Sequence, residues 1–254
     1  MSADRSYTIS IAGFDPTNGA GITADVKTFE QIGVYGLGVC TAVTVQNENE
    51  FKTVEWISLN TITEQLEILI DKYPVQFVKI GLIESFDVLE EVVFFLKKKN
   101  PDVKIIWDPI LKSSSGFVFH EQVFVKQLKN LLKDIFLITP NREEILKLSP
   151  ADSPEKAARN LMGLVNIYLK DGHNDGEEAI DRLFFERQEF ELKAERSEFS
   201  KHGSGCVFSS ALVAYLSMGN DVQQACAMAK EYVTRFINSD ESLLGWHKQQ
   251  VVNV

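Results

Sequence analysis

Cysteine and histidine are scarce in this chain. Its 254 residues include three cysteines, Cys40, Cys206 and Cys226, and four histidines. The cysteines are scattered, and no two histidines have the HxxxH or HExxH spacing of a zinc site. The sequence therefore contains no metal motif of this kind, and a reducing cytoplasm is the expected compartment.

Positive charge and long apolar runs are also lacking. Lys and Arg number 26 against 36 Asp and Glu, which gives a formal net charge of −10. Proteins that bind nucleic acids normally carry a basic face, so we expect no nucleic-acid partner. No uncharged apolar run reaches the length of a membrane span, and segment 1–7 lacks the apolar core of a signal peptide. We expect no membrane association, although a few lysines and backbone N–H groups can still bind a small anion.

Apolar strand patterns alternate with helical patterns along the whole chain. The alternation predicts a parallel sheet with helices on both faces, and an antiparallel pair at one edge. No linker or repeat divides the sequence, so we interpret residues 1–254 as one domain. The predicted strands are 8–13, 36–45, 51–59, 76–80, 103–107, 135–139, 166–170, 180–185 and 190–192. The predicted helices begin near 22 and at a Thr61-x-x-Glu64 capping box, and continue with 88–98, 123–132, 142–148, 154–162, 206–218 and 222–237.

The most informative stretch is KHGSGCVFSS at 201–210. Gly203 and Gly205 bracket Ser204, and Cys206 opens an apolar helical pattern. The first N–H groups of a helix carry positive partial charge, and glycines let them approach an anion closely. A thiol held there should have a lowered pKa. The stretch suits phosphoryl or acyl transfer, and the alternative is a helix start with a buried core cysteine.

Polar residues recur just after the predicted strands. Parallel strands end at a common edge, so these residues should lie together beside the glycine turn. No GxxxxGK[ST] motif occurs, which indicates a nucleotide site of another kind. Asp108 and Glu144 can hold Mg²⁺ through water, and Lys170 can neutralise phosphate. The residues at strand ends are Asp15, Gln46, Lys79, Asp108, Asn141 with Glu144, and Lys170.

The ordered set of short motifs resembles a known family. The motifs are AGFDP at 12–16, GAGI at 19–22, ADVKT at 24–28, TA at 41–42, VQN at 45–47, KIG at 79–81, DP at 108–109, TPN at 139–141 with Glu144, Lys170 with GH at 172–173, and HGSGC at 202–206. Together they resemble the ribokinase-like superfamily, and within it the hydroxymethylpyrimidine/phosphomethylpyrimidine kinases of thiamine biosynthesis. Cys206 is the most discriminating residue, because most sugar kinases of this superfamily carry Asp at that position.

The resemblance implies a fold, a reaction and a set of roles. The fold would be a three-layer α/β/α ribokinase-like domain with a mostly parallel central sheet and antiparallel edge strands. A homodimer would use ATP and Mg²⁺ to phosphorylate 4-amino-5-hydroxymethyl-2-methylpyrimidine or its monophosphate. The implied roles are base for Cys206; anion hole for Gly203, Ser204 and Gly205; substrate binding for Gly13, Ala20, Asp25, Gln46 and Leu82; nucleotide binding for Asp108, Asn141, Lys170 and His173; and metal binding for Asp108 and Glu144.

Two other functions remain open at this point. A pyridoxal or pyridoxine kinase of the same fold differs only slightly in its motifs. Leu82 stands where the family often has Met, and Asp171 replaces a Gly, so these departures bear on the range of substrates more than on the reaction. A non-catalytic sensor should have lost part of the phosphoryl-transfer set, which this sequence retains.

Overall fold

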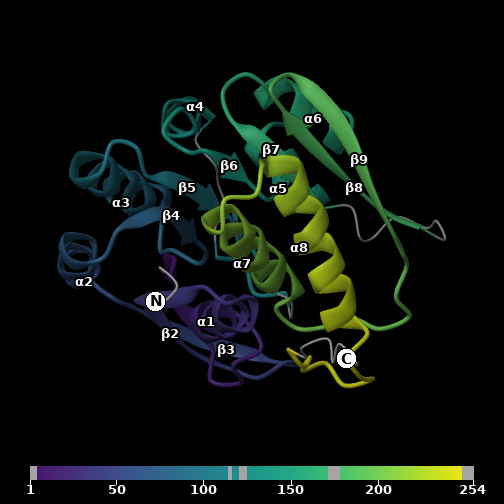
Figure 1. Ribbon diagram of the computed structural model, residues 1–254, viewed down its shortest axis with the longest axis horizontal. Coiled ribbons are helices and arrows are strands. Elements are labelled where there is room, and N and C mark those ends of the chain that lie inside the picture. The colour runs from purple at the N-terminus through teal and green to yellow at the C-terminus, as the bar shows by residue number, and fades with distance from the viewer. Residues whose placement is uncertain (1–4, 114–115, 120–124, 171–177, 248–254) are drawn as a thin grey trace.

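The computed structural model describes residues 5–113, 116–119, 125–170 and 178–247. Their strands form one nine-stranded sheet in the order β3-β2-β1-β4-β5-β6-β7-β8-β9 (Figure 1). The strands are β1 (Tyr7–Phe14), β2 (Tyr35–Gln46), β3 (Phe51–Trp56), β4 (Val75–Ile80), β5 (Lys104–Trp107), β6 (Leu137–Ile138), β7 (Asn166–Leu169), β8 (Glu178–Phe185) and β9 (Gln188–Glu195).

The centre of the sheet is parallel and both of its edges are antiparallel. Strands β2, β1, β4, β5, β6 and β7 pair in parallel, while β3 runs antiparallel to β2, and β8 runs antiparallel to β7 and β9. From β1 the chain moves outward to β2 and later returns to β4 on the other side of β1. Such a reversal opens a crevice at the carboxyl ends of the strands, where ligands bind in open α/β sheets.

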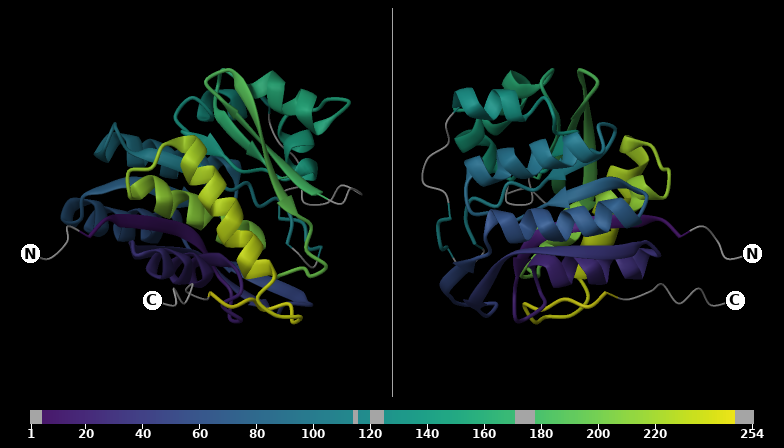
Figure 2. Two further views of the ribbon diagram at one scale, coloured as in Figure 1. Left: turned by 45° about the vertical axis from the view of Figure 1, so that its right-hand side comes forward. Right: turned by 90° about the vertical axis from the view of Figure 1, so that its left-hand side faces the viewer.

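Helices cover both faces of the sheet (Figures 1 and 2). One apolar core lies between the sheet and α2 to α6, and a second lies between the sheet and α1, α7 and α8. Alternate residues of a strand point to opposite faces, so Val78 belongs to the first core and Phe77 to the second. The helices are α1 (Gly21–Ile32), α2 (Leu59–Lys72), α3 (Phe86–Lys99), α4 (Val125–Leu131), α5 (Arg142–Leu148), α6 (Pro154–Leu161), α7 (Ser204–Ser217) and α8 (Val222–Ile237).

Helix α7 is the most buried helix of the second core and carries the glycine turn at its start. Ten of its residues are buried, and it packs against α1 on one side and α8 on the other. A helix that is apolar on all sides must lie inside the protein. This placement brings the N-terminal N–H groups of α7 to the carboxyl edge of the sheet, beside β1 and β4.

The expected three-layer fold with antiparallel edge strands is confirmed. The prediction that Thr61 starts the helix with a capping box is wrong. Helix α2 begins at Leu59, and its N-cap is Ser58, whose side chain accepts a hydrogen bond from the Thr61 N–H. The sequence pattern missed Ser58 because two polar residues three positions apart can both serve as caps. No helix in the described part of the chain has the length and apolar character that crossing a bilayer requires.

Candidate active site

The glycine turn presses directly on the loop that follows β1. Gly203 is the N-cap of α7 and has a φ of +75°, in the left-handed region that favours glycine. A Cβ at this position would lie 2.0 Å from the backbone oxygen of Gly19. No residue with a side chain fits there, so glycine is required for the contact between the turn and the loop.

Cys206 lies in the first turn of α7 with 7% of its surface exposed. The backbone N–H of Gly21 donates a hydrogen bond to its sulfur. Burial raises the pKa of the Cys206 thiol to about 11; Lys79 and the Gly21 N–H oppose the increase, and the carboxylates of Asp25 and Asp108 add to it. The prediction of a lowered pKa for the Cys206 thiol is therefore wrong. The helix N-terminus is present, but burial and two nearby carboxylates outweigh it.

Asp108, which is buried, and Lys170, which is partly exposed, form an ion pair next to the glycine turn. Lys170 Nζ donates to Asp108 Oδ1 over 2.8 Å, and Thr139 Oγ1 donates to the same oxygen over 2.9 Å. Ser209 Oγ of α7 donates to Asp108 Oδ2 over 3.1 Å. A Cβ placed on Gly205 would lie 3.2 Å from Lys170 Nζ. The bare backbone of the turn therefore faces this pair, which is the arrangement an anion cradle needs.

Glu144 lies beside this pair at the start of α5. Asn141 caps the helix, and the Asn141 side chain and the Glu144 side chain bond each other's backbone N–H in a capping box. Burial raises the pKa of the Glu144 carboxyl to about 7; Lys170 opposes the increase, and Asp108 adds to it. The backbone N–H groups of Asn141 and Leu111 also stabilise the ionised form. Glu144 thus changes its charge near neutral pH.

Asp25 is fully buried on the α7 side of the sheet. It forms an ion pair with Lys79, which is also fully buried, as expected for a core-facing residue near a strand end. Ser210 Oγ donates to Asp25 Oδ1 over 2.6 Å, and Ser10 Oγ donates to Asp25 Oδ2 over 2.5 Å. Both oxygens are therefore engaged by protein donors. Direct contact with an aminopyrimidine remains a prediction, and it requires one of these donors to give way.

The other residues expected at the substrate lie around the end of β1. A Cβ on Gly13 would lie 2.9 Å from Leu82 Cδ2, so these two residues are in close contact. Ala20 is the N-cap of α1, directly before the N–H that bonds Cys206. Gln46 ends β2, and its Nε2 donates to Thr44 Oγ1 over 2.9 Å. His173 lies outside the described residues.

The residues present fit a magnesium ion shared with phosphates. The part of the chain that the structure describes holds no cluster of three or more His, Cys, Asp or Glu side chains placed to bind a metal. Mg²⁺ does not require one, since it commonly takes one or two carboxylates together with substrate phosphates and water. Asp108 and Glu144, next to Lys170, offer such a donor set.

Comparison with known families assigns the chain. The family model described as phosphomethylpyrimidine kinase matches residues 15–252, which contain the glycine turn, Asp108, Glu144 and Lys170. The chain belongs to the phosphomethylpyrimidine kinase family. The resemblance that the motifs indicated is thereby confirmed.

Relatives and solved structures agree with the family and the fold. A hydroxymethylpyrimidine/phosphomethylpyrimidine kinase from Aquifex aeolicus is 34% identical over 244 residues, which cover 92% of this chain and 95% of the relative. A crystal structure of phosphomethylpyrimidine kinase from Clostridium difficile is 33% identical, with a TM-score of 0.76, and the match covers 91% of this chain and 99% of that one. An ADP complex of Bacillus subtilis pyridoxal kinase is 29% identical, with a TM-score of 0.78, and covers 92% of both chains.

Several residues of this kinase family site were not identified from the sequence as partners of the acids. Ser209 and Thr139 hold Asp108, and Ser210 holds Asp25. A usable signal existed, because a serine inside an apolar helix must find a hydrogen-bond partner when it is buried. Which acid each serine would bond could not be read from the sequence.

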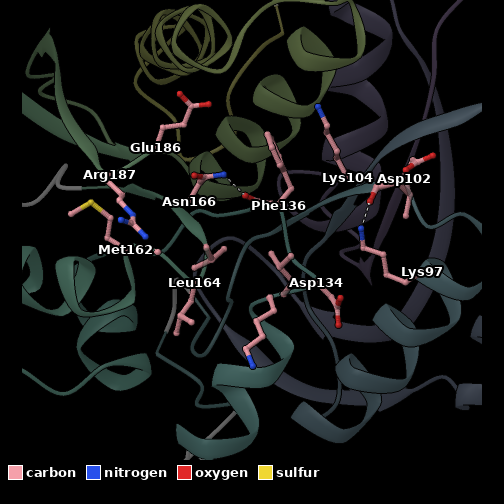
Figure 3. A pocket seen from close by; sticks show the side chains of 15 residues that line it. Lys97, Asp102, Lys104, Asp134, Phe136, Met162, Leu164, Asn166, Glu186 and Arg187 are labelled. Atoms are coloured by element: carbon pink, nitrogen blue, oxygen red, sulfur yellow. Dashed lines mark hydrogen bonds between the residues drawn. The ribbon is translucent and has the colours of Figure 1, made fainter.

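A cavity of about 410 Å³ lies at the opposite edge of the sheet. Figure 3 shows the side chains that line it. It lies at the amino ends of β5, β6 and β7, and none of the expected site residues line it. Basic side chains such as Lys104 and Arg187 alternate there with acidic ones such as Asp134 and Glu186. The mixed charge offers no preferred place for a polyphosphate, so the candidate site is the one at the carboxyl edge.

Proposed function

We propose that this protein transfers the γ-phosphoryl group of ATP to 4-amino-5-hydroxymethyl-2-methylpyrimidine or to its monophosphate, a step of thiamine biosynthesis. The observation that carries the proposal is the meeting of Cys206, the bare turn at Gly205 and the Asp108–Lys170 pair at one edge of the sheet. The relatives that bear this activity in their names support it. The nucleotide found in the pyridoxal kinase complex supports ATP as the donor.

Each group has a role that follows from its place. The N–H groups of Gly203, Ser204 and Gly205 would face the transferring phosphoryl group and stabilise its charge. Lys170 would neutralise the phosphates, and Asn141 lies beside it in a β-bridge at the same edge. Asp108 and Glu144 would hold Mg²⁺, which neutralises phosphate charge when bound. Positioning and charge stabilisation dominate this type of reaction, so little covalent chemistry is asked of the protein.

Cys206 is proposed as the proton acceptor. The hydroxymethyl oxygen would form its bond to phosphorus as the bond from phosphorus to the bridging oxygen of ADP breaks, and its proton would pass to the sulfur of the Cys206 thiolate, which thereby becomes the thiol. The pKa of about 11 means that the resting enzyme holds mainly the thiol at neutral pH. Lys79 and the Gly21 N–H oppose this increase in pKa and so supply the stabilisation that a thiolate needs.

Cys206→Ala tests the reaction directly. ADP formation is measured with ATP, Mg²⁺ and either the pyrimidine or its monophosphate. The rate should fall on the order of 10²–10⁴-fold, which is the usual contribution of general-base catalysis. Cys226→Ala is the matched control, because Cys226 is a buried cysteine on α8. No turnover by the folded parent with either pyrimidine would refute the proposal, and an unchanged rate in Cys206→Ala would remove its role as base.

A pyridoxal kinase is the second candidate. It is favoured by the 29% identity and common fold with the Bacillus subtilis enzyme. A panel with pyridoxal, the pyrimidine and its monophosphate at fixed ATP separates the two functions. We expect the larger kcat/KM with a pyrimidine, and a larger value with pyridoxal would favour the second candidate.

We also propose a single domain over residues 1–254 and a homodimer. The single sheet that runs through the described residues supports the first statement. The resemblance to the family supports the second. Sedimentation equilibrium would check the dimer, and a single cooperative unfolding transition would check the domain.

A further inference from the structure

Asp15 and His202 form a buried pair that links two segments of the site. His202 Nε2 donates to Asp15 Oδ2 over 2.9 Å, and only 6% and 2% of the two side chains are exposed. The residues are 187 positions apart in sequence. His202 Nδ1 is buried and has no hydrogen-bond partner among the described residues. The contact with Asp15 is thus what fixes the ring.

Asp15 organises the loop that follows β1. Its Oδ1 accepts from the Thr17 N–H over 2.9 Å, and its Oδ2 accepts from Thr17 Oγ1 over 2.8 Å and from the Ala20 N–H over 2.9 Å. Burial raises the pKa of Asp15, but the hydrogen bonds from His202, Thr17 and Ala20 outweigh it, so the pKa lies below its usual value. A single ionised carboxylate therefore holds both the loop and the ring.

His202 sits where the loop and the glycine turn meet. It directly precedes Gly203, whose α-carbon lies close to the backbone oxygen of Gly19. The His202 ring itself packs on Gly19, because a Cβ on Gly19 would lie 2.9 Å from His202 Cδ2. The same loop ends at Gly21, whose N–H bonds the Cys206 sulfur. Any movement of the loop against the turn would therefore move the donor on the thiol and the N–H groups of the turn.

We propose that Asp15 and His202 are a positioning pair for phosphoryl transfer: they fix the loop 15–21 against the turn 202–206 and so set the direction of the Cys206 sulfur. The inference rests on the proposed function of Cys206. Neither side chain needs to touch the substrate. Burial costs the Asp15 carboxylate its hydration, so the pair is better explained by the geometry that it imposes on the neighbouring turn than by a gain in stability.

Two substitutions of His202 separate positioning from simple stabilisation. His202→Gln places an amide nitrogen near the position of Nε2 and keeps a donor for Asp15, whereas His202→Leu removes the donor at similar volume. In His202→Leu we expect kcat to fall about 10²-fold, as for a misplacement near 1 Å, with little change in the KM for ATP. His202→Gln should recover most of kcat. Assays run far below the melting temperature of each variant, so that partial unfolding does not enter.

The second readout does not depend on kinase activity. Alkylation of Cys206 by iodoacetamide is followed against pH by mass spectrometry of its peptide. Loss of the Gly21 hydrogen bond should shift the alkylation profile of His202→Leu to higher pH, and His202→Gln should resemble the parent. A parent that alkylates as described but shows no turnover would contradict the proposed function and leave the positioning pair intact.

Asp15→Asn provides a variant that retains the shape of the side chain. Asp15 accepts three hydrogen bonds on Oδ2, from His202, Thr17 Oγ1 and the Ala20 N–H, and one on Oδ1 from the Thr17 N–H; whichever way the amide is turned, its NH₂ group faces a donor. We expect the same loss of kcat as in His202→Leu, and no further loss in the double variant, because the two residues act as a unit. Additive losses, or equal kcat values in the parent, His202→Leu and His202→Gln, would overturn the proposal.

Discussion

Lys79 and Asp25 form an ion pair in which neither side chain has any exposed surface. The pair lies directly behind Cys206, since Lys79 Nζ also donates to the Cys206 backbone oxygen over 3.5 Å. Burial lowers the pKa of Lys79, but the charges of Asp25, Cys206 and Asp108 raise it above its usual value. The lysine is therefore held as a cation beside the thiol. A buried pair of this kind seldom adds stability compared with apolar residues, which indicates a role in placing charge at the site.

Removal of Lys79 alone should destabilise the protein strongly. Lys79→Met leaves the Asp25 carboxylate buried without a counter-charge, and such changes cost about 3–5 kcal/mol of unfolding free energy. The double variant Lys79→Met/Asp25→Leu removes both charges and should recover much of that loss. Chemical denaturation measures both. Equal unfolding free energies in the single and double variants would show that the pair carries no such coupling.

The pH dependence of the rate should report the buried thiol. The pKa of Cys206 is about 11, so at lower pH each increase of one pH unit raises the thiolate fraction about tenfold. We therefore expect kcat/KM for the pyrimidine to rise with this slope between about pH 7 and pH 9. Cys206→Asp is the matched variant, because an aspartate is already ionised in this range, and its profile should be flat. A flat profile in the parent would exclude ionisation of Cys206 as the controlling step.

The sequence was sufficient for the residues whose positions depend on sheet topology. Asp108, Asn141 and Lys170 each follow a parallel strand, and such strands end at one edge, so their meeting could be predicted. The partner of Lys79 could not, because Asp25 lies 54 residues away on a helix whose rotation against the sheet depends on packing. Asp25 lies in the first turn of a predicted helix, and this position by itself is typical of an acid on the protein surface.

The sign of the thiol pKa shift was missed for a related reason. The helix N-terminus, which stabilises a thiolate, can be read from the glycine turn. The burial of Cys206, and the nearness of Asp25 and Asp108, depend on how α7 packs against the sheet. A local motif thus identified Cys206 as a candidate, whereas its protonation state depends on the tertiary structure.

Glu144 should make stability depend on pH. Its pKa is raised from 4.5 to about 7 in the folded protein, so between these values the folded state holds a proton that the unfolded state has released. The unfolded state then binds fewer protons, and the free energy of unfolding must fall as pH rises through this window. Glu144→Gln removes the effect, so its stability relative to the parent should increase by up to about 3 kcal/mol from pH 4.5 to pH above 7. Denaturation at several pH values measures the difference, and a pH-independent difference would contradict the raised pKa.

The two glycines of the turn should respond differently to alanine. A Cβ on Gly205 would reach Lys170 Nζ at 3.2 Å and Asp108 Oδ2 at 4.0 Å, and the flexible lysine can move away. Gly205→Ala should therefore fold normally, and alanine in place of glycine inside a helix is worth about 0.5–1 kcal/mol in stability. Its kcat/KM for ATP should fall about tenfold or more, because the methyl group displaces Lys170 and fills the face offered to the phosphates.

Gly203→Ala supplies the contrast within the same turn. Its Cβ would lie 2.0 Å from the Gly19 oxygen, and the φ of +75° is strained for alanine, so the variant should lose stability outright. Thermal unfolding and ATP titration of both variants measure the two effects separately. If Gly205→Ala kept the parent's kcat/KM while remaining folded, the phosphates would have to bind somewhere other than the face between Gly205 and Lys170.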